Sequence, residues 1–196
     1  VAYEDPITGL STLTKFKLDI AKALENAEPG EYALLALDVD NFSYINNWVG
    51  YEVGNKVLQV LARELQASAK NQTFLAREGS DIFLIFTNLK DLSDPKVLDD
   101  YRKNIVEAIP ELKKLNHHPT FNIGIYKITN LKQDISHMID CANIARRRVK
   151  GQYGDSIAEY TVELNAQIQK QRQIILEMEQ ALRRNLRSFY SLRLIY

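Results

Sequence analysis

A continuous apolar run over residues 32–37 ends directly in two acidic residues, Asp38 and Asp40. A strand as apolar as this one has to be covered on both faces, which is typical of the centre of a sheet packed between helices. The two carboxylates then lie where the strand leaves the hydrophobic core. The run therefore predicts a central strand with an acidic end, and this end is the first candidate for a functional site.

The chain up to residue 160 alternates between helical and extended patterns. Apolar residues at helical spacing predict helices over residues 16–27, 94–109 and 135–149. They also predict two helices between residues 41 and 67, with a break marked by Gly50 and Gly54 and a second helix that starts at Asn55. Apolar runs predict strands over residues 73–77, 82–87 and 120–128, the first two forming an antiparallel hairpin. The expected fold class is α/β (α+β), with a single mixed central β-sheet flanked by helices.

A different pattern follows residue 160. Its apolar residues recur at steps compatible with one face of a helix, at Leu164, Ile168, Ile175, Met178 and Leu182. This spacing predicts one long amphipathic helix. We therefore expect a globular domain at residues 1–158, a connector helix at residues 159–187, and the truncated start of a further domain at residues 188–196.

The composition is that of an ordinary globular protein, with 45% hydrophobic and 26% charged residues. Lys plus Arg and Asp plus Glu number 25 each, so no net field attracts polymeric nucleic acid, and we expect no such partner. The chain has one cysteine, which excludes an internal disulfide, and it has no apolar run of about 20 residues. We expect no membrane contact from this segment.

Five short blocks occur in the order and at the spacing of one known family. They are residues 5–10 (DPITGL), 38–42 (DVDNF), 79–83 (GSDIF), 122–125 (NIGI) and 140–147 (DCANIARR). Over about residues 3–157 the chain resembles GGDEF domains, the family that condenses two GTP molecules into cyclic di-GMP. The resemblance implies a nucleotidyl-cyclase-like fold. The single cysteine, with no signal peptide or membrane span in the sequence, predicts a cytoplasmic location, or the cytoplasmic part of a membrane-anchored bacterial protein. Residues 164–196 are similar to the connector and first strand of EAL domains, the cyclic di-GMP phosphodiesterases.

The resemblance implies a metal site at the end of the central strand. It assigns Mg²⁺, which prefers oxygen ligands, to Asp38, the backbone carbonyl of Val39, and Asp81. The alternative is structural, because aspartate is also common at helix N-caps and in turns. In that case Asp38 caps the following helix and Asp81 is a turn residue.

The resemblance also implies a set of nucleotide-binding residues. The amides at the start of the helix after the strand would attract phosphate, Asn46 and Asn55 would read guanine, and Arg147 would contact a phosphate. In the family an aspartate stands in place of Asn55 and a lysine in place of Ser43. The alternatives are that Asn55 is a helix N-cap and Arg147 a solvated surface cation. The complete set is Asn41, Phe42, Ser43, Asn46, Asn55, Gly79 and Arg147.

The block at residues 79–83 corresponds to the five-residue signature that gives the family its name. Two of its residues depart from the family pattern, so that no catalytic group is intact. Ile82 replaces a glutamate that the family uses for metal coordination or for activation of the attacking hydroxyl. An aliphatic side chain can do neither, and general-base help alone contributes about 10²- to 10⁴-fold in rate. Ser80 replaces a glycine, and its Cβ disfavours a positive φ.

These residues lead to three interpretations. The preferred one is a degenerate GGDEF domain, without efficient cyclase activity, that binds GTP or a related nucleotide with Mg²⁺ and regulates an adjacent EAL or sensor domain. The second is a weakly active diguanylate cyclase that works as a homodimer. The third is an interaction domain that binds no nucleotide.

Overall fold

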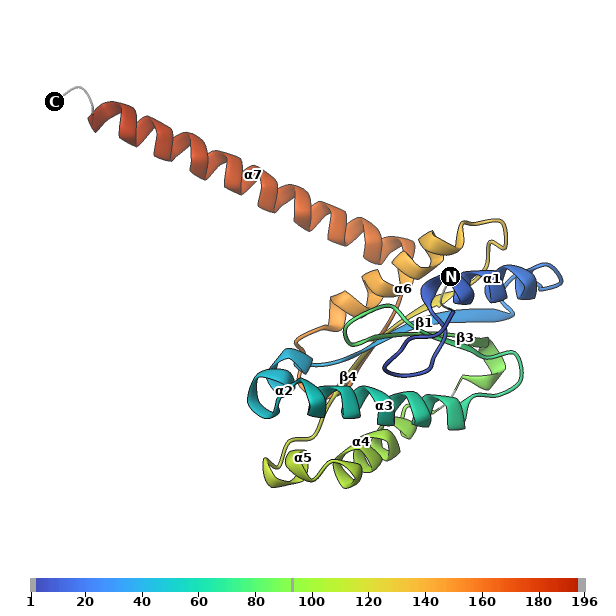
Figure 1. Ribbon diagram of the computed structural model, residues 1–196. Coiled ribbons are helices and arrows are strands. Elements are labelled where there is room, and N and C mark those ends of the chain that lie inside the picture. Colours follow the sequence, from blue (N-terminus) through green and yellow to red (C-terminus); the bar gives the residue numbers. More distant parts are fainter. Residues whose placement is uncertain (1–2, 93, 194–196) are drawn as a thin grey trace. The chain divides into compact units, whose positions relative to one another are not determined.

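The computed structural model describes residues 3–92 and 94–193. Its internal packing divides the chain into two units, residues 1–160 and 161–196. The elements of the first unit are shown in Figure 1 and run in the order α1 (Leu13–Leu24), β1 (Tyr32–Val39), α2 (Phe42–Val49), α3 (Tyr51–Ser68), β2 (Phe74–Arg77), β3 (Ile82–Asn88), a 3₁₀ turn (Leu89–Asp91), α4 (Val97–Ala108), α5 (Pro110–Lys114), β4 (Phe121–Lys127), α6 (Ile135–Val149) and β5 (Ser156–Glu159). The second unit holds α7 (Val162–Arg193).

The strands form one mixed sheet with β1 at its centre. The strand order is β2-β3-β1-β4-β5, in which only the pair β4 and β5 is parallel. All eight residues of β1 are buried, as expected for a strand that is covered on both faces. The mixed sheet predicted from the sequence is therefore confirmed.

Helices cover both faces of this sheet, and the alternation of side chains along β1 separates the two cores (Figure 1). Leu35 and Leu37 point toward a core built with α2, α3, α4 and α5. Leu34 and Ala36 point to the other face, where they pack with residues of α1 and α6. Asp38 continues this second series, so its side chain faces α6.

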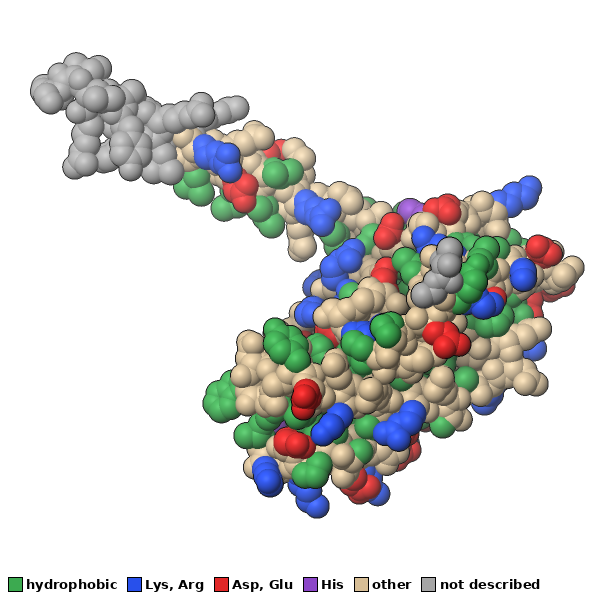
Figure 2. Space-filling model, viewed as in Figure 1, with side chains coloured by type: hydrophobic (Ala, Val, Ile, Leu, Met, Phe, Trp, Pro, Cys, Tyr) green, Lys and Arg blue, Asp and Glu red, His purple; other side chains and the backbone are tan. Residues whose placement is uncertain are grey.

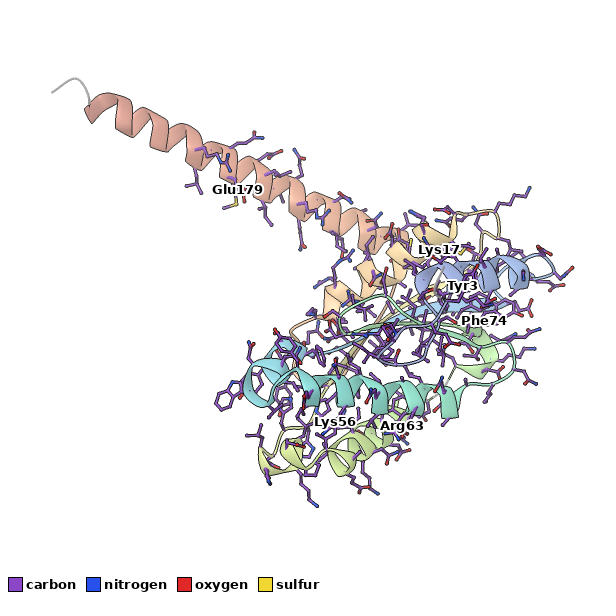
Figure 3. All side chains as sticks on the ribbon, in the orientation of Figure 1. Tyr3, Lys17, Lys56, Arg63, Phe74 and Glu179 are labelled. Atoms are coloured by element: carbon purple, nitrogen blue, oxygen red, sulfur yellow. The ribbon has the colours of Figure 1, made fainter. Side chains whose placement is uncertain are left out.

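Aromatic rings fill the sheet face under α1. Tyr32 and Phe86 stack with ring centroids 4.7 Å apart, and Phe74, labelled in Figure 3, stacks on Phe86 at 5.7 Å. The rings belong to β1, β3 and β2, so the stack crosses three neighbouring strands. Such pairs add specific geometry to the area that they bury.

One helix start and two short elements differ from the sequence prediction. The second helix after the central strand starts at Tyr51 and not at Asn55, because Gly54 is an interior residue of α3 rather than a helix break. A Cβ at Gly54 would lie 1.9 Å from Asn46 Oδ1, so this glycine serves the close contact between α2 and α3. The short elements α5 and β5 were not predicted. The helices over residues 94–109 and 135–149 are confirmed by α4 and α6.

The second unit is a single helix, α7, which confirms the long helix expected after residue 160. It continues through residues 188–193, where the resemblance suggested an opening strand, and residues 194–196 lie outside the described residues. The assignment of residues 188–196 to a further domain stays a prediction. Among the described helices, none combines the length and the apolar composition needed to cross a membrane.

The two signs of charge are mixed on the face of the first unit that Figure 2 shows. On the face in Figure 2, basic and acidic side chains alternate, without a continuous patch of either sign. This agrees with equal numbers of acidic and basic residues, 25 of each. It gives no support to a polyanionic partner on this face.

Gly124 on β4 allows α6 to lie directly against the sheet. A Cβ at this position would be 2.0 Å from the carbonyl oxygen of Ala142 and 2.2 Å from the backbone nitrogen of Arg146. Both are backbone atoms, which cannot move aside as a flexible side chain could. The missing side chain therefore sets the depth at which α6 packs, and with it the position of Arg146.

We predict that Gly124→Ala destabilises the domain. The new methyl group has to push α6 away from β4, and overpacking of this kind costs about 1–3 kcal/mol. Urea unfolding followed by circular dichroism measures the change. An unfolding midpoint equal to that of the wild type would contradict the close packing of α6 on β4.

The N-terminal loop holds the start of the β2–β3 hairpin. Asp5 accepts hydrogen bonds from the backbone and hydroxyl of Thr8 at 2.8 and 2.7 Å, and it forms an ion pair with Arg77 at 3.1 Å. Arg77 also donates to the carbonyl of Ser80 from Nε and Nη2, at 3.1 and 2.5 Å. Burial raises the pKa of Asp5, but hydrogen bonds from Thr8 and the Arg77 guanidinium outweigh it and lower the pKa below its ordinary value.

We predict that Asp5→Ala lowers the free energy of unfolding at neutral pH by about 1–3 kcal/mol, because it leaves Arg77 without its acid. The pKa of Asp5 is lower in the folded than in the unfolded chain. Its contribution is therefore present above the unfolded pKa of about 4 and is lost as the pH falls through the folded value. Urea unfolding at several pH values should find the variant closest to the wild type in acid. Glu4→Ala, at an exposed neighbour, is the control.

Candidate functional site

The acidic end of β1 forms the centre of the candidate site. Asp38 is fully buried at 0% exposure and Asp40 is buried at 7%. The Asp38 side chain lies on the sheet face that carries α6. Asp40 lies in the turn after β1, and its side chain reaches Asn122, which is paired with Asp38 in the sheet. A buried carboxylate needs partners that replace its hydration, and the two acids have different partners.

Asp38 is paired with two cations. Arg146 Nη1 and Lys150 Nζ both donate to Asp38 Oδ2, the lysine from 2.9 Å. The Arg146 side chain is 6% exposed, whereas that of Lys150 is 49% exposed. Asp38 Oδ1 is buried and accepts no hydrogen bond within the described part of the chain. The charge of Asp38 is thus balanced by α6 and by the residue that follows it.

Asn143 connects this ion pair to the hairpin. Its Oδ1 accepts from Arg146 Nε at 3.1 Å, and its Nδ2 donates to Glu78 Oε2 at 2.9 Å. Asn143 and Arg146 are one helical turn apart on α6 and therefore share a face with Lys150. The hydrogen bonds form a continuous path from Glu78 through Asn143 and Arg146 to Asp38.

Asp40 shapes the turn from β1 into α2. Its two oxygens accept from Asn122 Nδ2 at 3.1 Å and from Asn41 Nδ2 at 2.7 Å. Asn41 has a left-handed backbone, with φ 54°, and occupies the N-cap position of α2. The alternative in which Asp38 caps this helix is therefore wrong, because Asp38 faces α6 instead.

The predicted phosphate-binding turn lies at the start of α2. Asn41 and Ser43 are exposed, while the side chain of Phe42 is buried in the core with α3. The turn therefore offers backbone amides and two short polar side chains to a ligand. It offers no side-chain cation, because Ser43 stands where the family commonly has lysine.

Asn46 on α2 and Asn55 on α3 lie at the contact between these helices. Asn46 Oδ1 is buried against Gly54 and accepts no hydrogen bond from the described residues. Asn55 is partly exposed and follows Gly54 inside α3, so it is not the helix N-cap of the alternative reading. The side-chain amides of Asn46 and Asn55 therefore lie in one local region. The amide oxygen of Asn46 has no donor among the described residues.

The altered signature forms the turn between β2 and β3. Gly79 has φ 90° and Ser80 has φ 30°. Ser80 therefore adopts a positive φ, although its Cβ disfavours this region of backbone conformation. The Arg77 contacts to the Ser80 carbonyl hold this conformation. Asp81 is partly exposed, and its side chain forms no hydrogen bond or ion pair with any described residue.

Ile82 lies directly opposite Asp38 in the pairing of β1 with β3. Paired residues in an antiparallel ladder point to the same face, with Cβ atoms about 5 Å apart. The aliphatic side chain therefore occupies the place beside Asp38 where the family has glutamate. The resemblance had identified the two residues, and the strand register brings them together.

The residues that balance Asp38 were not found from the sequence. Arg147 was assigned to a phosphate, but its side chain is exposed, and the buried member of the arginine run is Arg146. The spacing of Asn143, Arg146 and Lys150 along one helical face is the signal that could have identified them. It is weak, because three consecutive arginines usually form a solvated surface.

The arrangement does not fit Mg²⁺ at the predicted ligands. A hard divalent cation needs several oxygen ligands, and here one oxygen of Asp38 is already held by two cations. The predicted ligand at Val39 is its backbone carbonyl, since its side chain is an aliphatic group buried in the opposite core. Within residues 3–92 and 94–193, no group of three or more His, Cys, Asp or Glu side chains is arranged to hold a metal.

Comparison with known proteins gives consistent matches. The family model described as diguanylate cyclase, GGDEF domain, matches residues 2–156. The bifunctional diguanylate cyclase/cyclic di-GMP phosphodiesterase MucR of Pseudomonas aeruginosa is 24% identical over 189 residues, which cover 94% of this chain and 27% of MucR. The chain spans about a quarter of the length of the first curated relatives that it matches, 22% and 27%.

Solved structures share the fold. The GGDEF domain of TpbB (YfiN) from Pseudomonas aeruginosa has a TM-score of 0.64 at 22% identity, covering 85% of this chain and 99% of that one. An S helix-GGDEF-EAL structure of Vibrio cholerae LapD, bound to c-di-GMP, has a TM-score of 0.57 at 16% identity and covers 80% and 37%. The expected nucleotidyl-cyclase-like fold is confirmed, and with the family match over residues 2–156 the chain belongs to the GGDEF domain family of cyclic di-GMP signalling.

Proposed function

We propose that this chain is a regulatory GGDEF domain that binds GTP or a related nucleotide, has lost efficient cyclase activity, and acts on an adjacent domain of a longer protein. The observation that carries the proposal is the surroundings of Asp38. An aliphatic residue, Ile82, lies opposite it on β3, and two cations hold its Oδ2. Asp38, the acid that would support the reaction, is thus engaged in ion pairs within the fold.

The loss of turnover follows from the chemistry of the reaction. Phosphodiester formation from a triphosphate requires removal of a proton from the attacking hydroxyl and neutralisation of phosphate charge, commonly by Mg²⁺. Ile82 can supply neither a base nor a ligand. Asp38 Oδ1 has no partner among the described residues, but a divalent ion there would lie beside Arg146 and Lys150, whose positive charges already balance this acid.

Nucleotide binding is supported by an unpaired acceptor, by backbone amides and by exposed cations. Asn46 Oδ1 is a buried acceptor without a donor among the described residues, and such a group destabilises the fold by about 1–3 kcal/mol until a donor reaches it. An N–H group on a guanine edge could fill this role. The amides at the start of α2 and the exposed cations Arg147 and Lys150 are suited to phosphate.

A regulatory role fits the organisation of relatives. MucR is named as both a cyclase and a phosphodiesterase, and the LapD structure joins a GGDEF domain to an EAL domain. In this chain α7 follows the domain and exposes apolar side chains, among them Ile175, Met178 and Leu182, that an adjacent domain or a second copy could cover. Because the role requires GTP, we assign the domain to the cytoplasmic side of the membrane.

We predict saturable GTP binding that depends on Asn46. Calorimetry with the wild type and with Asn46→Ala should give a dissociation constant at least about 10-fold higher for the variant, the scale of one lost hydrogen bond. Asn47→Ala, at an exposed neighbour on α2, is the control and should bind as the wild type does. Absence of GTP binding in the wild type would instead support a nucleotide-free interaction domain.

We predict that the wild type forms no cyclic di-GMP from GTP and Mg²⁺, even at protein concentrations that favour a homodimer. The product is measured by chromatography of the reaction mixture. Formation of cyclic di-GMP would support the alternative of a weak cyclase.

A companion variant combines Ile82→Glu, Ser80→Gly and Arg146→Ala, which restores an acid, relaxes the turn and frees Asp38. Its product formation should rise by at least about 10²-fold above the background of the assay. A triple variant that binds GTP but stays inactive would show that these three residues do not account for the loss.

A further inference from the structure

Arg146 is a buried cation with a single acidic partner among the described residues. Its guanidinium donates to Asp38 from Nη1 and to the amide oxygen of Asn143 from Nε. A buried guanidinium is tolerated only when it is paired and hydrogen-bonded. A metal ion on Oδ2 would leave Arg146 with a buried and unbalanced charge, and a metal ion on the unpartnered Oδ1 would place a second positive charge next to the buried guanidinium.

The backbone of Arg146 lies directly against the sheet. A Cβ at Gly124 would lie 2.2 Å from Arg146 N and 2.9 Å from its Cα, which shows how closely α6 approaches β4 at this residue. The side chain of Arg146 is 6% exposed, so the guanidinium is enclosed beside Asp38. The contact with Asp38 is thus part of the packing of α6.

Lys150 differs from Arg146 in this respect. It follows the last residue of α6, and 49% of its side chain is exposed. Its flexible ammonium group can leave Asp38 Oδ2 for another anion while Arg146 continues to balance the acid. Of the two cations at Asp38, Arg146 therefore stays in place and balances the acid, whereas Lys150 can move and contact a ligand.

We propose that Arg146 permanently takes the place at Asp38 that a divalent metal would occupy, and that the nucleotide of the proposed function consequently binds without a metal ion, with Lys150 as a phosphate contact. The nucleotide part rests on the proposed function. The part that concerns Asp38 and Arg146 does not, since it can be tested without nucleotide.

The first experiment uses metal ions alone. Thermal unfolding of the full chain is measured with and without Mg²⁺, and Mn²⁺ binding is followed by electron paramagnetic resonance. The wild type should respond to neither ion. Arg146→Met keeps the approximate length of the side chain but removes its charge. This variant should gain a rise of about 2–4 °C with saturating Mg²⁺, because Asp38 then keeps only the movable Lys150 as a partner. Arg148→Met, an exposed arginine of α6, is the control and should behave as the wild type.

Two outcomes overturn the assignment of Arg146. One is a wild-type protein that binds Mn²⁺ and loses this binding in Asp38→Asn. The other is a folded Arg146→Met variant without a metal response. If Arg146→Met does not fold, Mn²⁺ binding to the wild type and to Asp38→Asn decides the question. The double variant Asp38→Asn, Arg146→Met lacks both buried charges. It should fold and show no change in thermal unfolding with Mg²⁺.

The second experiment compares GTP binding in Mg²⁺ and in a chelating buffer. The dissociation constants should agree within about threefold, and Lys150→Met should raise both by about 10-fold. GTP binding that disappears in the chelator would overturn metal-independent recognition. If GTP binds in neither buffer, the proposed function fails, and the metal titrations still decide whether Arg146 replaces a metal at Asp38.

Discussion

The ion pair between Asp38 and Arg146 is the constraint on which the site depends. A carboxylate at the end of a central strand, with 0% exposure, is stable only if a cation reaches it inside the protein. Gly124 makes this possible, because the missing side chain lets α6 approach β4 closely enough for Arg146 to reach β1. The packing of one helix thus determines the electrostatics of the site.

The same helix links the ion pair to the altered signature. Asn143 stands between Arg146 and Glu78, which immediately precedes Gly79 in the turn from β2 to β3. From the other side, Arg77 connects the Ser80 carbonyl to the N-terminal loop. Two independent sets of contacts therefore hold the turn that precedes Ile82. Under the proposed function, this turn supports the fold rather than the reaction.

The sequence predicted those features that leave a local pattern. The apolar run of β1 and the helical spacing of α6 each determine their element without knowledge of distant contacts. Gly54 was misjudged, because its reason for being glycine is a contact with Asn46 on another helix. Arg146 was missed for a similar reason, since a buried and an exposed arginine in one run look alike until the helix is placed on the sheet. The sequence therefore did not predict the roles of residues that depend on tertiary contacts.

Ile82 and Arg146 act on the same acid from two neighbouring elements. By resemblance, the family has glutamate at residue 82, so the aliphatic side chain of Ile82 places one negative charge fewer beside Asp38. Arg146 supplies the buried positive charge that Asp38 requires, and the more exposed Lys150 shares the same oxygen. Removal of Arg146 would take the buried cation from the acid, and an acid at residue 82 would add a second negative charge for these cations to balance. Under the proposed function, the carboxylate therefore serves the fold rather than the reaction.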